Sequence, residues 1–112
     1  MTEQFLKIAK MEDLPEGRAT VVEVGGKRLA VCRVEGSVFA IDDLCTHDGG
    51  PLGEGELEDH QIECPRHGAR FDIRTGKALC LPAILPVHSY KIEIRNDEVW
   101  AELPVGVTGG AQ

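Results

Sequence analysis

Apolar and polar residues alternate in short runs along most of the chain. The run Tyr90-Lys91-Ile92-Glu93-Ile94 shows the period of two that is typical of a half-buried β-strand. The same pattern, with β-branched and aromatic residues favoured, predicts strands over seven segments: Phe5–Ile8, Thr20–Val24, Lys27–Val34, Ser37–Ile41, Gln61–Cys64, Tyr90–Ile94 and Glu98–Leu103.

Glycine, asparagine and aspartate mark the breaks between these strands. Gly25-Gly26, Glu35-Gly36 and Asn96-Asp97 each separate two predicted strands and favour tight hairpin turns. Only Met11–Leu14 indicates a helical turn, and the proline and glycine that come after it would end it at once. We therefore expect an all-β chain of short antiparallel strands.

The segment from Asp42 to Pro86 departs from this pattern, because glycine and proline recur through it. A loop-rich segment of this length inside a compact domain needs another source of order, and a bound metal group would supply it. We expect a single domain over residues 1–104, with this subdomain at about 42–86 and a flexible tail at 105–112.

Composition restricts the class of protein further. At 112 residues, with 42% apolar and 28% charged residues, the chain suits one soluble, monomeric globular domain. No apolar stretch approaches the roughly 20 residues that span a bilayer, and the first residues resemble no signal or transit peptide. We expect a cytoplasmic protein that does not bind membranes.

The net charge of −7 and the pI near 5.0 argue against nucleic acid as a partner. A partner protein with a basic docking patch fits better, although acidity also serves solubility. Glu54, Glu56, Glu58 and Asp59 could meet such a patch, and a solvated face is the alternative.

Two cysteine–histidine pairs carry the candidate chemistry. Cys45 and His47 form the first pair, Cys64 and His67 form the second, and sixteen residues separate His47 from Cys64. Thiolates and imidazoles suit zinc or an iron–sulfur cluster and suit calcium poorly. Zinc sites usually place two cysteines before two histidines, whereas here each segment offers one of each. Two such loops could place both cysteines on one iron and both histidines on another.

These segments resemble the two cluster-binding loops of Rieske proteins. They read Cys45-Thr46-His47-Asp48-Gly49-Gly50-Pro51-Leu52 and Cys64-Pro65-Arg66-His67-Gly68-Ala69-Arg70-Phe71-Asp72, followed by Thr75-Gly76-Lys77. The resemblance implies an all-β Rieske domain, a small antiparallel sandwich or barrel with an inserted cluster-binding subdomain. It also implies one [2Fe-2S] cluster held by Cys45, His47, Cys64 and His67, with both histidines at an exposed tip where electrons leave. Pro65 and Pro82 would stiffen the loops.

The chain departs from the high-potential Rieske proteins of respiratory complexes. Those proteins carry cysteines at the positions of Gly50 and Arg66, and hydroxyl side chains at Ala69 and Phe71. Without these hydrogen-bond donors the potential should lie toward the low end, roughly −150 mV. Gly49, Gly50 and Gly68 would let backbone N–H groups approach the sulfides; ordinary turn chemistry is the simpler interpretation, and both can hold.

The resemblance implies a one-electron carrier that is not itself an enzyme. Small Rieske ferredoxins of this kind pass electrons from an NAD(P)H-dependent flavoprotein reductase to a terminal oxygenase in aromatic-ring dioxygenase systems. Two alternatives are the small subunit of an NADH-dependent nitrite reductase and a zinc-stabilised docking module.

The remaining candidate residues have simpler interpretations. Cys32 is expected in a strand or the core, Cys80 as a structural thiol in a loop, and Trp100 in the core. We assign no function to His60 or His88.

Overall fold

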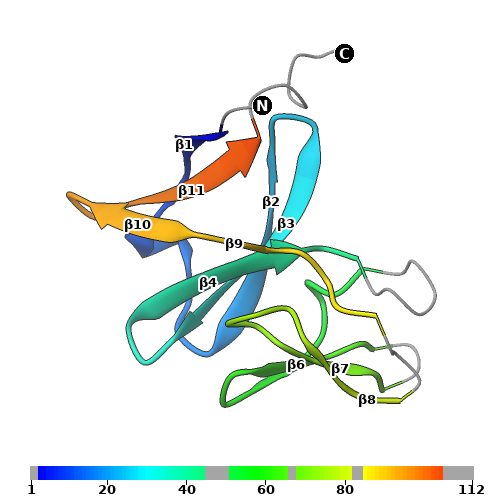
Figure 1. The fold of residues 1–112 in the computed structure, drawn as a ribbon. Helices are drawn as coiled ribbons and strands as arrows, with labels where there is room; N and C mark the ends of the chain where they lie inside the picture. The colour runs from blue at the N-terminus through cyan, green and yellow to red at the C-terminus, as the bar shows by residue number, and fades with distance from the viewer. Residues whose placement is uncertain (1–2, 45–50, 66–67, 82–84, 105–112) are drawn as a thin grey trace.

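A computed structural model describes residues 3–44, 51–65, 68–81 and 85–104, and its strands form three small antiparallel sheets (Figure 1). The fold class is therefore the all-β architecture that the alternating pattern predicts. Among the described residues, no helix is long and apolar enough to cross a membrane.

The central sheet has the strand order β2-β3-β4-β9. Its strands are β2 (Arg18–Val24), β3 (Lys27–Val34), β4 (Ser37–Asp42) and β9 (Ser89–Tyr90). Gly26 and Gly36 both have φ +80° in the turns between the first three strands. Glycine adopts this left-handed conformation without a steric penalty, which explains why both predicted hairpins form here.

A second sheet pairs the two ends of the chain in the order β1-β11-β10. It consists of β1 (Glu3–Lys10), β10 (Ile92–Arg95) and β11 (Glu98–Pro104). Asn96 and Asp97 have φ of 52° and 65° and form the predicted hairpin turn. The predicted helical turn is a single 3-10 turn over Met11–Asp13.

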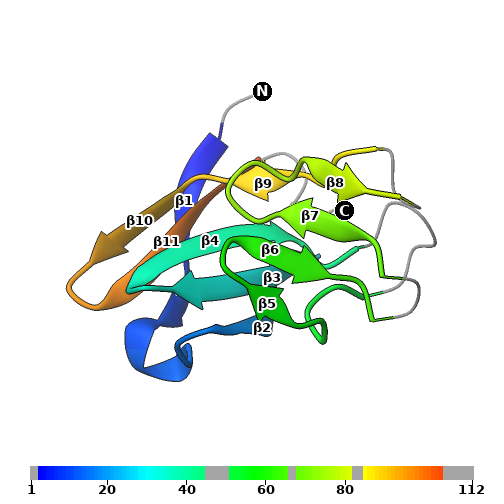
Figure 2. The same cartoon turned by 90° about the horizontal axis from the view of Figure 1, so that it is seen from below.

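The third sheet, in the order β5-β6-β7-β8, lies in the loop-rich part of the chain. Its strands are β5 (Leu57–Glu58), β6 (Gln61–Glu63), β7 (Arg70–Asp72) and β8 (Ala78–Cys80). Only the strand at Gln61 was predicted, because polar and apolar residues alternate over Gln61–Cys64; the other three are short segments set among glycines and turn residues. Figure 2 shows this small sheet beside the central one.

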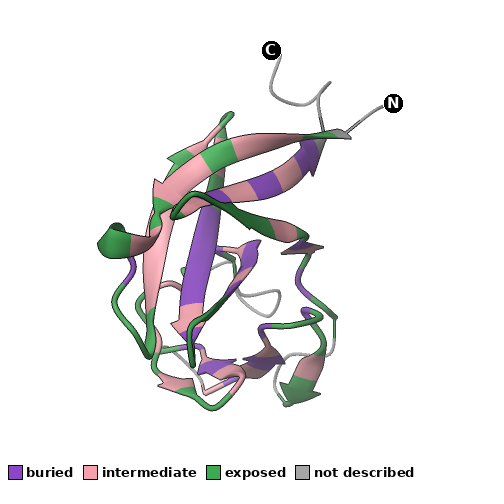
Figure 3. Ribbon diagram, turned by 90° about the vertical axis from the view of Figure 1, so that its left-hand side faces the viewer, coloured by how far each residue is buried: buried purple, intermediate pink, exposed green. Residues whose placement is uncertain are grey.

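The core has two compartments that share β3. Leu29 and Val31 pack with Leu14, Val99 and other residues between the central and terminal sheets. Alternate residues of the same strand, Ala30 and Cys32, pack with Leu52, Ile62 and Phe71 of the loop-rich region. Because side chains of a strand alternate between its faces, β3 is buried on both; Figure 3 shows the buried residues between the sheets.

Trp100 does not lie in the core, contrary to the prediction. Its neighbours on β11, Val99 and Ala101, are fully buried, so Trp100 points to the opposite face and is only partly buried. The guanidinium of Arg95 lies 4.8 Å from the centre of a Trp100 ring. The indole therefore forms a cation–π contact outside the core.

Two hydrogen bonds hold the backbone between β8 and the end of β9 in place. Val87 donates its N–H to the carbonyl of Gly76 at 2.8 Å. A Cβ at Gly76 would overlap the carbonyl oxygen of Val87, so only glycine permits this approach. Tyr90 then donates its hydroxyl to a carboxylate oxygen of Asp42 at 2.5 Å, which joins β9 to β4.

We predict that Tyr90→Phe lowers the free energy of unfolding by about 2 kcal/mol near neutral pH, because Asp42 loses a hydrogen-bond donor. Burial, and then the bond to Asp42, raise the pKa of Tyr90. Above about pH 10 an unfolded tyrosine loses its proton while Tyr90 keeps it, so this contribution falls as pH rises. Urea unfolding at pH 7 to 11 should show the two proteins converging; a constant difference would contradict the assignment.

Candidate metal centre

Of the four predicted ligands, only Cys64 belongs to the described residues; Cys45, His47 and His67 lie outside them, as do Gly49, Gly50 and Pro82. The structure therefore defines the site through the residues that flank the two segments. Within the described part of the chain, no three His, Cys, Asp or Glu side chains gather as a metal site would require.

The second segment leaves β6 and returns into β7 through a closed turn. Cys64 donates its N–H to the carbonyl of Ala69 at 2.7 Å, and Gly68 donates its N–H to the carbonyl of Cys64 at 3.0 Å. Gly68 has φ +78°, which favours glycine. Its amide is thus used within the turn, as the simpler of the two interpretations of this glycine expects.

A buried carboxylate closes the first segment. Asp43 comes directly after β4, and its side chain is fully buried. Its Oδ1 accepts the N–H of Leu52 at 2.8 Å and the N–H of Gly53 at 2.5 Å. Arg28 approaches Oδ2 with Nη2 at 3.3 Å, and this contact raises the pKa of Arg28. The residues on either side of the segment with Cys45 and His47 are therefore bonded together.

The ordered residues that follow the first segment, 52–56, pack against those that lead into the second, 63–64; we call these two stretches the segment bases. Glu63 donates its N–H to the carbonyl of Glu56 at 3.0 Å. A Cβ at Gly55 would overlap the carbonyl oxygen of Glu63, so the backbones touch at this point. Leu52 from the first base and Cys64 from the second are both fully buried in the same core compartment. The structure thus brings the flanks of both predicted ligand pairs to one place.

Among the described residues, the buried side chains that share a core compartment with Cys64 are apolar, and the two of them that were predicted to lack donors are buried there. Ala69 and Phe71 are fully buried in the compartment that holds Cys64, and neither side chain has a hydrogen-bond donor. The chain has one tyrosine, Tyr90, and its hydroxyl is donated to Asp42.

Cys32 and Cys80 occupy different environments, and both are free thiols. Cys32 is a buried strand residue, as predicted, and burial raises the pKa of its thiol to about 12. Its side chain therefore packs as a small apolar residue of the core. Cys80 does not lie in a loop, contrary to the prediction: it ends β8 and is exposed, with Sγ 3.7 Å from the carbonyl oxygen of Gly68.

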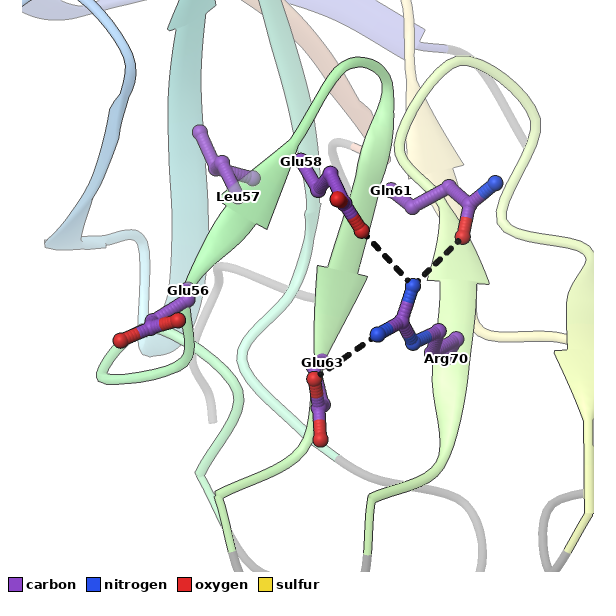
Figure 4. Close-up of a pocket in the computed structure, with 6 residues that line it drawn as sticks. All are labelled: Glu56, Leu57, Glu58, Gln61, Glu63 and Arg70. Atoms are coloured by element: carbon purple, nitrogen blue, oxygen red, sulfur yellow. Dashed lines mark hydrogen bonds and ion pairs between the residues drawn. The ribbon is translucent and has the colours of Figure 1, made fainter.

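Arg70 gathers acidic residues on the outer face of the small sheet (Figure 4). Its Nη1 lies 3.0 Å from Glu58, and its Nη2 lies 3.2 Å from Glu63. The hydrogen bond to Glu58, followed by the charge of Glu63, raises the pKa of Arg70. Glu54, Glu56, Glu58 and Asp59 are all exposed, so part of the predicted acidic cluster is neutralised and the rest faces solvent.

His60 and His88 have packing roles that need no metal. The ring of His60 meets Phe39 edge-on with centroids 5.5 Å apart, and the ring of His88 meets Tyr90 at 4.5 Å. The residues that sequence reasoning missed are Asp43, Arg28 and Arg70. Arg70 lies in the second of the two quoted segments, but no role was assigned to it. No short motif marks Asp43 or Arg28, because their partners lie far away along the chain.

We predict that Gly55→Ala destabilises the fold by about 1–3 kcal/mol, because the added Cβ must push the Glu63 backbone away from Gly55. Glu54→Ala, at the exposed neighbouring position, should change the free energy of unfolding by less than about 0.5 kcal/mol. Urea denaturation followed by circular dichroism measures both. Equal stabilities for the two variants would show that the two bases are not in contact.

Comparisons with known proteins agree with this geometry. The family model described as "Rieske [2Fe-2S] domain" matches residues 4–91. The ferredoxin component of the naphthalene 1,2-dioxygenase/salicylate 5-hydroxylase systems of Ralstonia sp is 42% identical over 103 residues, which cover 92% of this chain and 99% of that protein.

Solved structures give the same match. The ferredoxin of carbazole 1,9a-dioxygenase from Nocardioides aromaticivorans IC177 has a TM-score of 0.84 and 35% identity, covering 88% of this chain and 96% of that one. A chain of the complex of reduced oxygenase and oxidized ferredoxin in carbazole 1,9a-dioxygenase has a TM-score of 0.80 and 36% identity, with coverages of 87% and 91%.

Proposed function

The chain belongs to the Rieske [2Fe-2S] domain family, and from that premise we propose that Cys45, His47, Cys64 and His67 hold one [2Fe-2S] cluster per chain. The observation that carries this proposal is the meeting of the two segment bases at Cys64. Two thiolates and two imidazoles are the donor set that a Rieske cluster requires. Cys64, a free and fully buried thiol in an apolar compartment, fits the role of an inner ligand.

The protein is an electron carrier of a multicomponent oxygenase system and not a catalytic enzyme, as its relatives are ferredoxin components. It delivers single electrons to the terminal oxygenase of an aromatic-ring dioxygenase and receives them from an NAD(P)H-dependent flavoprotein reductase. When bound, the cluster supplies the one-electron couple. We further propose that the chain is monomeric and cytoplasmic, with one domain over residues 1–104, its subdomain at about 42–86, and a flexible tail at 105–112.

The described residues serve this function by excluding water from one side of the site. Leu52, Ala69 and Phe71 are fully buried in the core compartment of Cys64, and their side chains have neither a hydroxyl nor an ionisable group. Electron transfer therefore involves no proton donor or acceptor among these three side chains. A low potential is then expected, because hydroxyl donors to sulfur would raise it.

Exposed leucines adjoin the same segments and support docking to the terminal oxygenase. Leu44 directly precedes Cys45 and is 46% exposed, and Leu81, directly after β8, is 74% exposed. Apolar side chains that border a redox site gain free energy when a partner protein covers them.

The ligand assignment predicts that Cys64→Ser loses the cluster. Iron per chain should fall close to zero, together with the reduced EPR signal whose average g lies below that of all-cysteine clusters. Cys32→Ser and Cys80→Ser should retain both iron and signal, because neither cysteine belongs to a cysteine–histidine pair: Cys32 lies within β3 and Cys80 is exposed at the end of β8. A colourless wild-type protein with one zinc ion would overturn the electron-transfer function and favour a docking module.

The docking surface predicts a specific kinetic defect. Leu81→Glu should slow reduction of a naphthalene-type terminal oxygenase by about tenfold, since it places a charge in an apolar contact. Ile94→Glu is the matched control, because Ile94 is 47% exposed but lies on β10 in the terminal sheet. Stopped-flow mixing of the reduced ferredoxin variants with oxidised oxygenase measures the rate. Equal rates for both variants would place the contact elsewhere.

A further inference from the structure

Asp43 lies between the central sheet and the first ligand segment, two residues before Cys45. Its own N–H is donated to the carbonyl of Arg28 at 3.0 Å, which continues the pairing of β4 with β3 by one residue. The sheet therefore fixes the backbone of Asp43, and the side chain is left to bond to the far side of the ligand segment.

The carboxylate of Asp43 spans the segment. Its Oδ1 accepts hydrogen bonds from Leu52 and Gly53, which lie just beyond the segment, at 2.8 Å and 2.5 Å. A Cβ at Gly53 would overlap Cγ2 of Val21 and lie 3.1 Å from Oδ1, so glycine is needed for this close approach. This one oxygen atom thus links Asp43, before the segment, to Leu52 and Gly53, after it.

Arg28 completes the environment of this carboxylate. Its Nε and Nη2 lie 3.4 Å and 3.3 Å from Oδ2, and its Nη1 lies 2.8 Å from Glu23. The Asp43 side chain is fully buried, and a buried carboxylate is stable only when it is paired and hydrogen-bonded. The two backbone N–H groups and the guanidinium together meet this requirement.

We propose that Asp43, held by Arg28, is a positioning residue that fixes the first ligand segment and so controls how firmly the cluster is retained. The proposal rests on the proposed function, because it takes Cys45 and His47 as ligands. Charge produces a second effect. Since reduction adds negative charge to the cluster, loss of the Asp43 charge raises the potential and loss of the Arg28 charge lowers it.

The test compares iron release to a ferrous chelator, the redox potential, and the EPR spectrum in the purified holoprotein. Asp43→Ala should release iron at least about tenfold faster than the wild type, with a broadened spectrum. Asp43→Asn should partly rescue retention, because its amide oxygen still accepts from Leu52 or Gly53. Asp43→Asn should raise the potential, and Arg28→Gln should lower it.

Glu16→Ala is the matched control. The Glu16 carboxylate also accepts backbone N–H groups, from Glu35 and from Gly36 at 3.1 Å, and lies 3.7 Å from Nε of Arg33. Glu35 and Gly36 form the turn between β3 and β4, at the opposite end of β4 from Asp43. The loss of this carboxylate should lower the melting temperature without changing iron release, potential or spectrum.

The outcomes separate the two proposals. If Asp43→Asn and Asp43→Ala lower only the melting temperature, as expected for Glu16→Ala, Asp43 is structural and this inference is wrong while the proposed function stands. If Asp43→Ala does not fold, the retention and potential of Asp43→Asn and Arg28→Gln decide the matter. A wild-type protein that binds no iron–sulfur cluster overturns both proposals.

Discussion

Burial of β3 on both faces is the constraint on which the rest of the structure depends. Leu29 and Val31 belong to one core compartment, and Ala30, Cys32 and Val34 belong to the other. A strand buried on both sides fixes the register of the strands beside it, because a slip of one residue would exchange the two sets of side chains. The central sheet thereby becomes a rigid base for the loop-rich region.

Short polar contacts connect the central sheet to the candidate metal centre. The last pairing of β4 with β3 places Asp43, whose carboxylate joins the two sides of the first segment. The second segment depends on the pairing of Glu63 with Arg70 and on the turn closed by Gly68. Each ligand segment therefore begins and ends on an ordered strand or a bonded backbone. A region built from short strands and loops acquires a defined geometry in this way.

Residue patterns with a short period could be predicted from the sequence, and contacts between distant residues could not. The hairpins at Gly25-Gly26, Glu35-Gly36 and Asn96-Asp97 reflect local backbone preferences, and the structure confirms them. The strands β5, β7 and β8 were missed because they are short segments set among glycines and turn residues. Trp100 was misplaced because aromatic character does not say which face of a strand a residue occupies. Spacing drew attention to the two cysteine–histidine pairs, which stay a prediction, but not to Asp43, whose partners are fifteen and nine residues away.

The surroundings of Cys64 also explain how one small domain can carry an electron without a catalytic site. In the part of the chain that the structure describes, the buried side chains of the core compartment of Cys64 are apolar, and the hydroxyl of Tyr90, the one tyrosine, is donated to Asp42. Backbone N–H groups and the fixed charges at the two segment bases are then the features that adjust the redox potential of the cluster. Arg28 and Arg70 each face two carboxylates, so one negative charge is left uncompensated at each of them. Because nearby negative charge disfavours reduction, both segment bases favour the low potential that the absence of hydroxyl donors also predicts.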